Sequence, residues 1–376
     1  MNMENVSSSG VSKKYPICSY CGACAAFVPN FDKFKEDEAM TNKGCMGSSS
    51  TGSCYTVCPR SYSICSDDRS ECVRREYGNC NISSLSNPEG NTIGPYLSIV
   101  STRAFNENNK KNGQDGGVVT ALLDMALNEG FVDSAVVAGK SEDEPWRPEP
   151  VVATKGDDLT KSSGSKYTAC PSILGVWEAI EKGYEKIALV GTPCNIEAMR
   201  KIQSLHDRSL ESDKVKILIG LFCTETFWYK DLVKYLSKMG VDINKVSKFD
   251  ISKGKFKIYT DGDVKEVPIK ELEGLARSAC NICNDFASEL ADISAGSVGS
   301  EEGWTTLVIR SQVGQELIDM AISKGIIETK ELTEDEISKI NKISSNKKLK
   351  NWDKMMQQIE SCSACNSSPI PSVFIT

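Results

Sequence analysis

Apolar residues recur along residues 96–330 in patterns that predict alternating strands and helices. Uninterrupted or alternating apolar runs indicate strands, and apolar residues three or four positions apart indicate amphipathic helices. Strands are expected at residues 97–105, 133–139, 187–194, 215–223 and 305–311, and a hairpin at 254–269. Helices are expected at residues 118–130 and 313–325, and in a segment that ends near residue 182. We therefore predict an α/β core with a largely parallel or mixed sheet flanked by helices.

Two of the predicted strands end in a cysteine, Cys194 and Cys223. In open α/β sheets, ligands bind at the carboxyl ends of the strands, so these two side chains are expected at one edge. Further along, Cys280 and Cys283 form a Cys-x-x-Cys pair, which holds a metal centre but leaves it two ligands short. We predict that these four residues, the core cysteine set, bind one cluster. The alternative is that Cys194 and Cys223 are ordinary buried cysteines.

The composition favours metal or cluster binding over disulfide bonds as the role of the cysteines. The 376 residues include 16 cysteines and a single histidine, and the first residues show no apolar leader, which favours clusters over disulfides. The scarcity of histidine argues against histidine-based acid–base catalysis and mixed-ligand zinc sites. A formal charge of -7 argues against nucleic-acid binding, and no apolar run approaches the ~20 residues of a membrane span. A cytoplasmic location is expected.

The N-terminal segment carries the spacing of a bacterial-type ferredoxin. Cys18, Cys21 and Cys24 form a C-x2-C-x2-C run, and Cys58-Pro59 ends a second, incomplete run. In two-cluster ferredoxins the last cysteine of one run ligates the other cluster. One [4Fe-4S] cluster is therefore predicted on the N-terminal cysteine set, which comprises Cys18, Cys21, Cys24 and Cys58.

The second ferredoxin site has lost most of its ligands. Its four positions fall on Val28, Ser48, Thr51 and Cys54, of which only the last can bind iron. The alternative is a rebuilt second site, with ligands from Cys45, Cys54, Cys65, Cys72 and Cys80. Two further cysteines near the end, Cys362 and Cys365, are interpreted as non-ligating or as contacting a partner.

Two glycine-containing turns precede predicted helices. The turn at 113–117 opens the helix at residue 118, with Asp115 as its expected N-cap, and its glycines make it a candidate phosphate site. A simple tight turn is the alternative. Residues 164–168 place small, cationic and hydroxyl side chains before the next helix, and a solvated loop is the alternative there. Lys166 and Arg310 are candidates to contact phosphate or coenzyme carboxylates.

Composition also suggests where the chain divides. Residues 1–80 form the ferredoxin-like extension, 81–95 are rich in turn-forming residues and are expected to be a linker, and 96–330 form the core. Residues 331–376 are highly charged and are expected to form a solvated, helical tail.

The motifs QDGGVVTALL, GSKYTACPS, GTPCN, GLFCTETF, SKGKFKIYT and CNICNDFASELADISAGSVGSEEGW occur in this order within residues 96–330. With them the chain resembles the beta subunit of coenzyme F420-reducing hydrogenase, and more closely the F420H2 dehydrogenase input subunit with its N-terminal ferredoxin extension. Those input subunits keep both ferredoxin sites, whereas this chain has the ligands of one. The chlorophyllide 7-hydroxymethyl reductase type is a second relative, which lacks the match at SVGSEEGW.

The resemblance implies FAD, a [4Fe-4S] cluster on the core cysteine set and coenzyme F420 as the hydride partner, with residues 96–330 as the binding domain. No side chain is expected to be catalytic, because the chemistry belongs to the cofactors. Trp304 is expected either near the flavin or in the core. The flavin contacts implied by the resemblance fall on Gly116, Gly117, Thr120, Ser165, Lys166, Tyr167, Thr168 and Gly299.

The expected function is an F420-dependent oxidoreductase that passes electrons singly through FAD and two clusters. Its partner would be a redox protein or a member of a larger hydrogenase or dehydrogenase complex, at most peripheral to a membrane. The alternatives are a ferredoxin-linked reductase of another substrate, a non-enzymatic electron-transfer subunit, and a zinc-stapled binding protein.

Overall fold

The computed structural model describes residues 18–24, 57–60, 91–205 and 208–361. Seven cysteines for which the sequence left alternatives lie outside these ranges, and their roles stay predictions. They are Cys45, Cys54, Cys65, Cys72, Cys80, Cys362 and Cys365.

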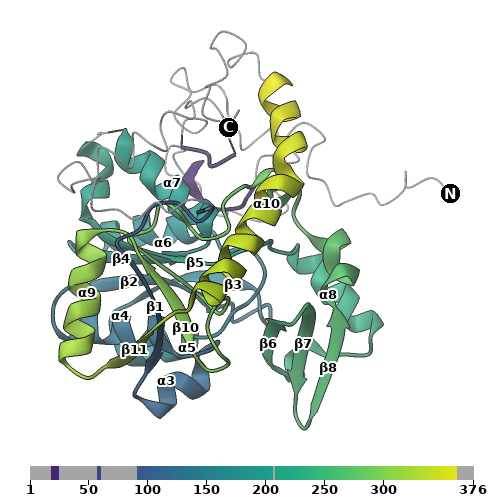
Figure 1. Cartoon of the computed structure of the whole chain (residues 1–376), viewed down its shortest axis with the longest axis horizontal. Helices are drawn as coiled ribbons and strands as arrows, with labels where there is room; N and C mark the ends of the chain where they lie inside the picture. The colour runs from purple at the N-terminus through teal and green to yellow at the C-terminus, as the bar shows by residue number, and fades with distance from the viewer. Residues whose placement is uncertain (1–17, 25–56, 61–90, 206–207, 362–376) are drawn as a thin grey trace.

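An eight-stranded mixed sheet forms the centre of the described chain, with strands in the order β11-β1-β10-β9-β5-β4-β2-β3. The four central strands β9, β5, β4 and β2 run parallel, and the strands on both sides of them pair antiparallel (Figure 1). The predicted α/β class with a mixed sheet is therefore confirmed. The strands are β1 (Ser98–Ala104), β2 (Ser134–Lys140), β3 (Pro148–Ala153), β4 (Ile187–Gly191), β5 (Val215–Leu221), β9 (Ile293–Gly296), β10 (Thr305–Ile309) and β11 (Ile327–Glu331).

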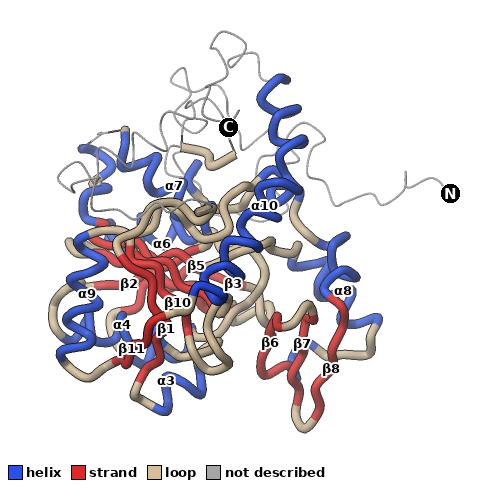
Figure 2. The backbone as a smooth tube through the Cα atoms, in the orientation of Figure 1, coloured by secondary structure: helices blue, strands red, loops and turns tan. Residues whose placement is uncertain are grey.

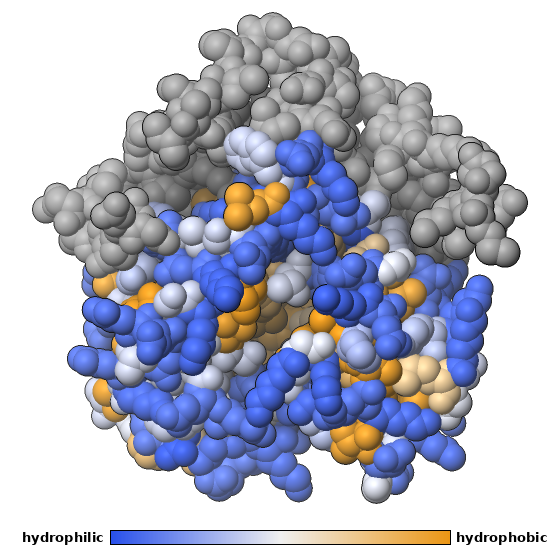
Figure 3. Space-filling view, turned by 45° about the vertical axis from the view of Figure 1, so that its right-hand side comes forward, coloured by the Kyte–Doolittle hydropathy of each residue, from blue (hydrophilic) through white to orange (hydrophobic). Residues whose placement is uncertain are grey.

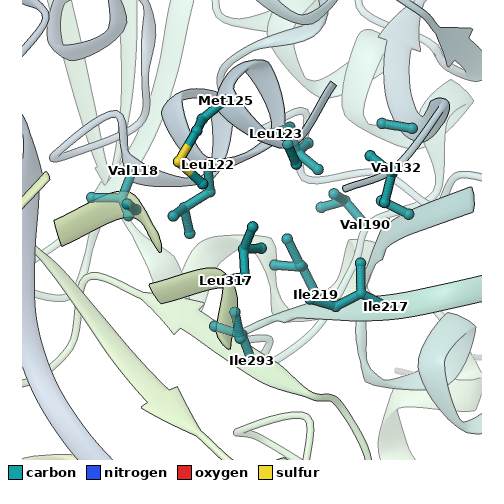
Figure 4. Packing of buried hydrophobic residues seen from close by; sticks show 14 of the residues in the cluster. Val118, Leu122, Leu123, Met125, Val132, Val190, Ile217, Ile219, Ile293 and Leu317 are labelled. Atoms are coloured by element: carbon teal, nitrogen blue, oxygen red, sulfur yellow. The ribbon is translucent and has the colours of Figure 1, made fainter. Parts of the chain in front are cut away.

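Helices cover both faces of this sheet (Figure 2). On one face, α4, α5 and α9 contribute to a shared apolar cluster, and on the other α6 and α7 contribute to a second. Strand β2 shows why two clusters form, because Ala135 and Val137 join the first while Val136, between them, joins the second. Figure 4 shows the first cluster, with Leu122 of α4 and Leu317 of α9 facing Ile219 of β5. The helices are α3 (Glu107–Asn112), α4 (Val118–Asn128), α5 (Gly156–Ser162), α6 (Ser172–Glu181), α7 (Pro193–Ser204) and α9 (Gln312–Ser323).

A smaller unit packs beside the large sheet (Figure 1). It consists of α8 (Tyr229–Lys238) and the antiparallel strands β6 (Val246–Ser252), β7 (Lys255–Thr260) and β8 (Asp263–Pro268). Its apolar cluster includes Phe249, Phe256 and Trp146, and the indole of Trp146 donates a 3.0 Å hydrogen bond to the Val246 carbonyl. The hairpin predicted at residues 254–269 is β7–β8, so that prediction is confirmed.

The last described helix, α10 (Glu334–Ser361), crosses the molecule rather than lying outside it (Figure 1). Ile340 is fully buried against Ile93 and Phe286, and Asn341 accepts hydrogen bonds from the Thr92 backbone N–H and hydroxyl. Residues 334–361 are helical as expected, and one face of the helix is buried against the core while most of its other described residues are at least partly exposed. Of the described helices, none is both long and apolar enough to cross a membrane.

Two local predictions also differ from the structure. Gly117, in a left-handed conformation, caps the start of α4, whereas Asp115 was the expected N-cap. Strands β3, β6, β9 and β11 were also missed from the sequence, and β9 has only four residues, soon after the cysteine pair. The other core strands and helices expected from the apolar pattern are confirmed.

Candidate functional site

Cys194 lies in the first turn of α7, directly after strand β4. The five residues of β4 are all buried, and Thr192 then ends the strand and caps the helix in a reciprocal capping box with Asn195. Pro193 suits the first helical position because its missing N–H needs no partner there. The Thr192 hydroxyl lies 3.1 Å from Cys194 Sγ. The sulfur is therefore held at the carboxyl end of β4.

Cys223 lies at the same edge because β5 runs parallel to β4 and ends two residues before it. Its backbone N–H donates a 2.9 Å hydrogen bond to the Phe286 carbonyl. The neighbouring strand on the other side, β9, is also parallel to β5. The predicted placement of Cys194 and Cys223 at one sheet edge is confirmed by this topology.

The Cys280–Cys283 pair is carried by a short 3-10 helix, Ser278–Ile282. The Cys283 N–H donates to the Cys280 carbonyl at 3.3 Å, and the Thr226 N–H donates to Cys280 Sγ at 3.4 Å. Because Thr226 is three residues after Cys223, this contact holds the pair beside the end of β5.

The four thiols of the core cysteine set influence one another electrostatically. Burial raises the pKa of Cys223, and the three other thiols of the set raise it further. Burial likewise raises the pKa of Cys194, with contributions from Cys283 and Cys280. None of these thiols is in a disulfide. The structure thus brings together residues that lie up to 89 positions apart in the sequence.

Helix α10 also contributes polar side chains that contact the core cysteine set. Lys347 Nζ donates to the carbonyls of Cys223 and Asp285 at 2.7 and 2.8 Å. Asn351 Nδ2 donates to the carbonyls of Cys280 and Cys283 at 2.8 and 2.6 Å. Burial works to raise the pKa of Cys283, but Lys347 and Arg60 outweigh it, so that the pKa is lowered.

The N-terminal cysteine set docks on α6 and α7, close to Cys194. The Cys21 carbonyl accepts a 3.1 Å hydrogen bond from the Ile173 N–H, and the Cys58 carbonyl accepts one of 2.8 Å from Lys201 Nζ. Burial raises the pKa of Cys21 well above its usual range, with contributions from Cys58 and Cys194. The two sets are therefore adjacent, with Cys194 near both.

Two arginines lie at the junction of the sets. Arg277 is fully buried, donates to the Cys18 carbonyl at 2.9 Å and lies 3.8 Å from the centre of the Trp228 ring. Burial raises the pKa of Cys18 to about 11, although Arg277 lowers it. Arg60 forms a 3.6 Å ion pair with Glu197, and it lowers the pKa of Cys194 against the effect of burial.

Both cysteine sets offer thiols alone as donors. Four-iron clusters are held by four cysteine thiolates, so the donor type fits such clusters, and structural zinc sites can also be built from four cysteines. Within the described residues, no group of three or more cysteine, histidine or carboxylate side chains is placed to hold a single metal ion.

The two glycine-containing motifs meet, although they are 51 residues apart. The Ser165 N–H donates a 3.1 Å hydrogen bond to Gln114 Oε1, and Lys248 Nζ donates to the Gln114 carbonyl at 2.9 Å. The Tyr167 hydroxyl accepts a 3.0 Å hydrogen bond from the Ile251 N–H. Both motifs are thus joined to strand β6. Burial, Asp250 and Glu302 raise the pKa of Asp115, in the same turn, to about 6.

Packing within the chain accounts for the two glycines of the first motif. A Cβ on Gly117, where φ is 68°, would lie 2.3 Å from the Asn109 carbonyl oxygen, and one on Gly116 would lie 2.9 Å from the Thr102 oxygen. Thr120 lines a polar surface cavity of about 430 Å³ with residues of α3 and α5. Whether these residues also bind a flavin is untested and stays a prediction.

Lys166 and Thr168 offer different possibilities to a ligand. The buried Lys166 ammonium donates to three carbonyls of its own loop, those of Ser162, Ser163 and Gly164. Burial, assisted by Lys140, lowers its pKa to about 7. Within the described residues, the buried Thr168 hydroxyl has no hydrogen-bond partner, which suits a bound polar group. Figure 3 shows a hollow with apolar walls between the large sheet and the three-stranded unit.

The remaining candidates are placed as follows. Gly299 packs against α10, since a Cβ there would lie 2.7 Å from Ile340 Cδ1. Trp304 is half-buried between Arg103 and Lys330, 4.5 and 4.2 Å from its ring centre, so the core-packing alternative is wrong. The expectation that Arg310 binds phosphate is also wrong. Its buried guanidinium donates to Ser294 Oγ and to the Pro95 and Ala287 carbonyls.

Sequence reasoning missed the polar groups around the cysteines. Lys347 and Asn351 lie in a highly charged helix, so the hydropathy pattern of the sequence does not reveal that they are buried. The available signal was their spacing with Ile340 and Ser344, which puts all four on one helix face. Arg60 and Arg277 lie two and three residues from predicted ligands, which is a positional signal that could have been used.

The fold defines a cysteine-rich α/β protein in which two sets of cysteine thiols lie next to each other. Sequence models of the N-terminal and C-terminal parts of the coenzyme F420 hydrogenase/dehydrogenase beta chain match residues 99–174 and 184–335, respectively. The chain belongs to the coenzyme F420 hydrogenase/dehydrogenase beta-subunit family, as its motifs predicted. The named relatives are oxidoreductases or their subunits.

Relatives differ in how much of this chain they match. The coenzyme F420 hydrogenase subunit beta of Methanothermobacter thermautotrophicus is 41% identical over 263 residues, 69% of this chain and 93% of that protein. The coenzyme F420-dependent sulfite reductase of Methanocaldococcus jannaschii is 36% identical over 361 residues, 91% of this chain but 50% of that protein. A chain in the xenon-derivatised F420-reducing [NiFe] hydrogenase complex from Methanosarcina barkeri is 34% identical, with a TM-score of 0.68, covering 75% of this chain and 98% of that one.

Proposed function

We propose that this chain is a flavin- and iron–sulfur-dependent oxidoreductase that exchanges a hydride with coenzyme F420. It would pass electrons singly, through FAD and two [4Fe-4S] clusters, to or from a partner redox protein or a member of a larger complex. The observation that carries the proposal is the convergence of the core cysteine set at one sheet edge, beside the N-terminal cysteine set. The names of the family's members support F420 as the coenzyme.

The chain's own residues would position these cofactors. Bound FAD supplies hydride exchange with the coenzyme and release of single electrons, and the clusters carry those electrons. Thr168 offers a buried hydroxyl to the flavin, in the loop that Gln114 and Tyr167 fix against the three-stranded unit. The proposal gives no role to a histidine, because the hydride and the electrons would move between cofactors and the protons released on oxidation of the coenzyme would pass to water.

The matches to relatives favour a particular kind of partner. The match to the sulfite reductase spans 91% of this chain, so it cannot be confined to the core and includes part of the N-terminal cysteine region. The match to the hydrogenase beta chain of Methanothermobacter covers 69% of this chain. We infer that the N-terminal cluster is the contact for an external acceptor, and that this acceptor is a reductase.

The proposal is tested on anaerobically purified full-length protein. We expect about eight irons and eight sulfides per chain, and one FAD released on denaturation. Reduced coenzyme F420 should regain its oxidised absorbance only when a one-electron acceptor such as benzyl viologen is present. Each two-electron oxidation of the coenzyme should reduce two equivalents of acceptor. NADH is the control donor and should be inert.

A matched cysteine variant serves as the control for non-specific loss of iron. Cys170 is a free thiol that follows the second motif loop by two residues and belongs to neither set. Cys170→Ala should keep all the iron. Zinc in place of iron and sulfide, or iron without coenzyme oxidation, would overturn the proposal in favour of the zinc-binding or non-enzymatic alternatives.

A further inference from the structure

Helix α10 presents one buried face to the core cysteine set. Ile340, Ser344, Lys347 and Asn351 are buried, at intervals of four, three and four residues, so they share one side of the helix. The matched family models end at residue 335, before this face begins. These contacts therefore belong to a part of the chain to which those models assign nothing.

Lys347 places a positively charged ammonium group on the buried face of α10. The residue is 8% exposed, and its ammonium donates to the Cys223 and Asp285 carbonyls. Within the described chain no carboxylate forms an ion pair with it; the Asp285 carboxylate instead accepts hydrogen bonds from the Glu289 N–H. The Asp285 carboxylate still interacts electrostatically with Lys347 and offsets part of its charge, but the buried ammonium acts on the core cysteine set with little screening by water.

The effect of such a charge on a cluster has a definite sign. Reduction adds one negative charge, and a buried cation attracts it more strongly than a cation in water would, because the local dielectric is lower. The net charge, hydrogen bonding and solvent exposure around a cluster set its reduction potential. A buried ammonium beside one cluster therefore favours the reduced form of that cluster.

We propose that Lys347 tunes the core cluster, raising its reduction potential so that it accepts electrons from the flavin side, while Asn351 fixes the peptide that carries Cys280 and Cys283. The inference rests on the proposed core cluster. Lys347 acts through charge at a distance, so it is a positioning and tuning residue rather than a catalytic one. The alternative is that Lys347 only anchors α10 to the core.

The test separates charge from anchoring with three substitutions at one position. Lys347→Met removes charge and donors, Lys347→Gln keeps a donor without charge, and Lys347→Arg keeps the charge. Lys350→Met is the matched control, since Lys350 is 60% exposed on the same helix. Midpoint potentials of both clusters are read by EPR during redox titration of the full chain, with iron and sulfide measured in each sample.

We expect one of the two cluster signals to shift to a lower potential in Lys347→Met and Lys347→Gln, and the other signal to stay. At a fixed solution potential, the ratio of reduced to oxidised core cluster should fall about tenfold. For a one-electron couple this corresponds to a decrease of about 59 mV in the midpoint potential. Lys347→Arg should restore the ratio, and Lys350→Met should leave it unchanged.

Other outcomes overturn the inference in distinguishable ways. If Lys347→Gln keeps its iron and both potentials, Lys347 is only an anchor and the proposed function stands. If Lys347→Met loses iron, the comparison of the Gln and Arg variants still decides between charge and anchoring. If the wild-type chain holds no iron and sulfide, the proposed function and this inference fail together.

Discussion

The core and N-terminal cysteine sets are built on opposite principles. Three members of the N-terminal set lie within seven residues, whereas the core set draws on the ends of two parallel strands and a separate 3-10 helix. The N-terminal set is placed by hydrogen bonds from Ile173, Lys201 and Arg277 to its carbonyls. The core set depends on the eight-stranded sheet itself. A local motif can thus dock on a fold that assembles its own site from distant segments.

The charges around the two sets also differ. The core set has Lys347 from α10, with no carboxylate paired to it in the described chain. The N-terminal set has Arg277 at Cys18 and Lys201 at Cys58, and Lys201 is paired with Glu197 at 3.5 Å. Because different cations lie beside the two sets, we expect the two clusters to have different potentials. This contrast can be tested by substituting residues of the core set and of the N-terminal set in turn.

The largest effect should come from breaking the core set. In Cys280→Ala we expect loss of about four of the eight irons, because one cluster loses a ligand. Coenzyme-linked reduction of viologen should fall to the level of the protein-free control. Iron analysis and the viologen assay check this, with Cys170→Ala as the matched control. Retention of all the iron would show that Cys280 is not a ligand.

Breaking the N-terminal set should separate the two sites. Cys58→Ala should also lose about four irons, yet keep most of the viologen reduction, because a small dye can take electrons from the core cluster directly. Transfer to a ferredoxin-sized protein acceptor should be lost. If the dye activity falls as far as in Cys280→Ala, the two sites do not form a sequential relay.

The sequence predicted the N-terminal set from spacing and the core set from topology, and these are different kinds of information. Ferredoxin spacing fixes Cys18, Cys21, Cys24 and Cys58 without knowledge of a fold. Placing Cys194 beside Cys223 required the prediction of parallel strands, which long apolar runs make visible. The strands that carry these two cysteines, and their meeting at one end of the sheet, could therefore be predicted, whereas β3, β9 and β11 could not.

Polar burial could not be predicted in the same way. The charge of Lys347 and the charged helix around it made α10 look like a surface element, because average hydropathy gives no weight to a single buried lysine. Arg310 looked like a phosphate ligand for the corresponding reason, although three main-chain and side-chain oxygens satisfy it. Burial of such groups depends on partners from other segments, which only the assembled fold supplies.

A smaller effect should follow from loosening α10 over the core set. Asn351→Ala removes the side-chain donor to the Cys283 carbonyl and one of the two donors to the Cys280 carbonyl, and an unsatisfied buried group costs about 1–3 kcal/mol. We expect a lower melting temperature and earlier loss of the core cluster on heating, with the N-terminal cluster unaffected before global unfolding. Melting followed by circular dichroism and by cluster absorbance measures both. Lys350→Ala is the exposed control, and an equal loss there would contradict the argument.

The smallest effect concerns Arg60, which lowers the pKa values of Cys58, Cys194 and Cys283 and so acts on both sets. Its charge is partly neutralised by Glu197 at 3.6 Å, so Arg60→Met should lower both potentials by less than Lys347→Met lowers one. Glu197→Gln removes the neutralising charge and should raise both potentials. Redox titration of the two variants gives the sign directly, and Arg60→Lys should restore the wild-type values. Shifts of the same sign in Arg60→Met and Glu197→Gln would show that packing at the junction, rather than charge, controls the two clusters.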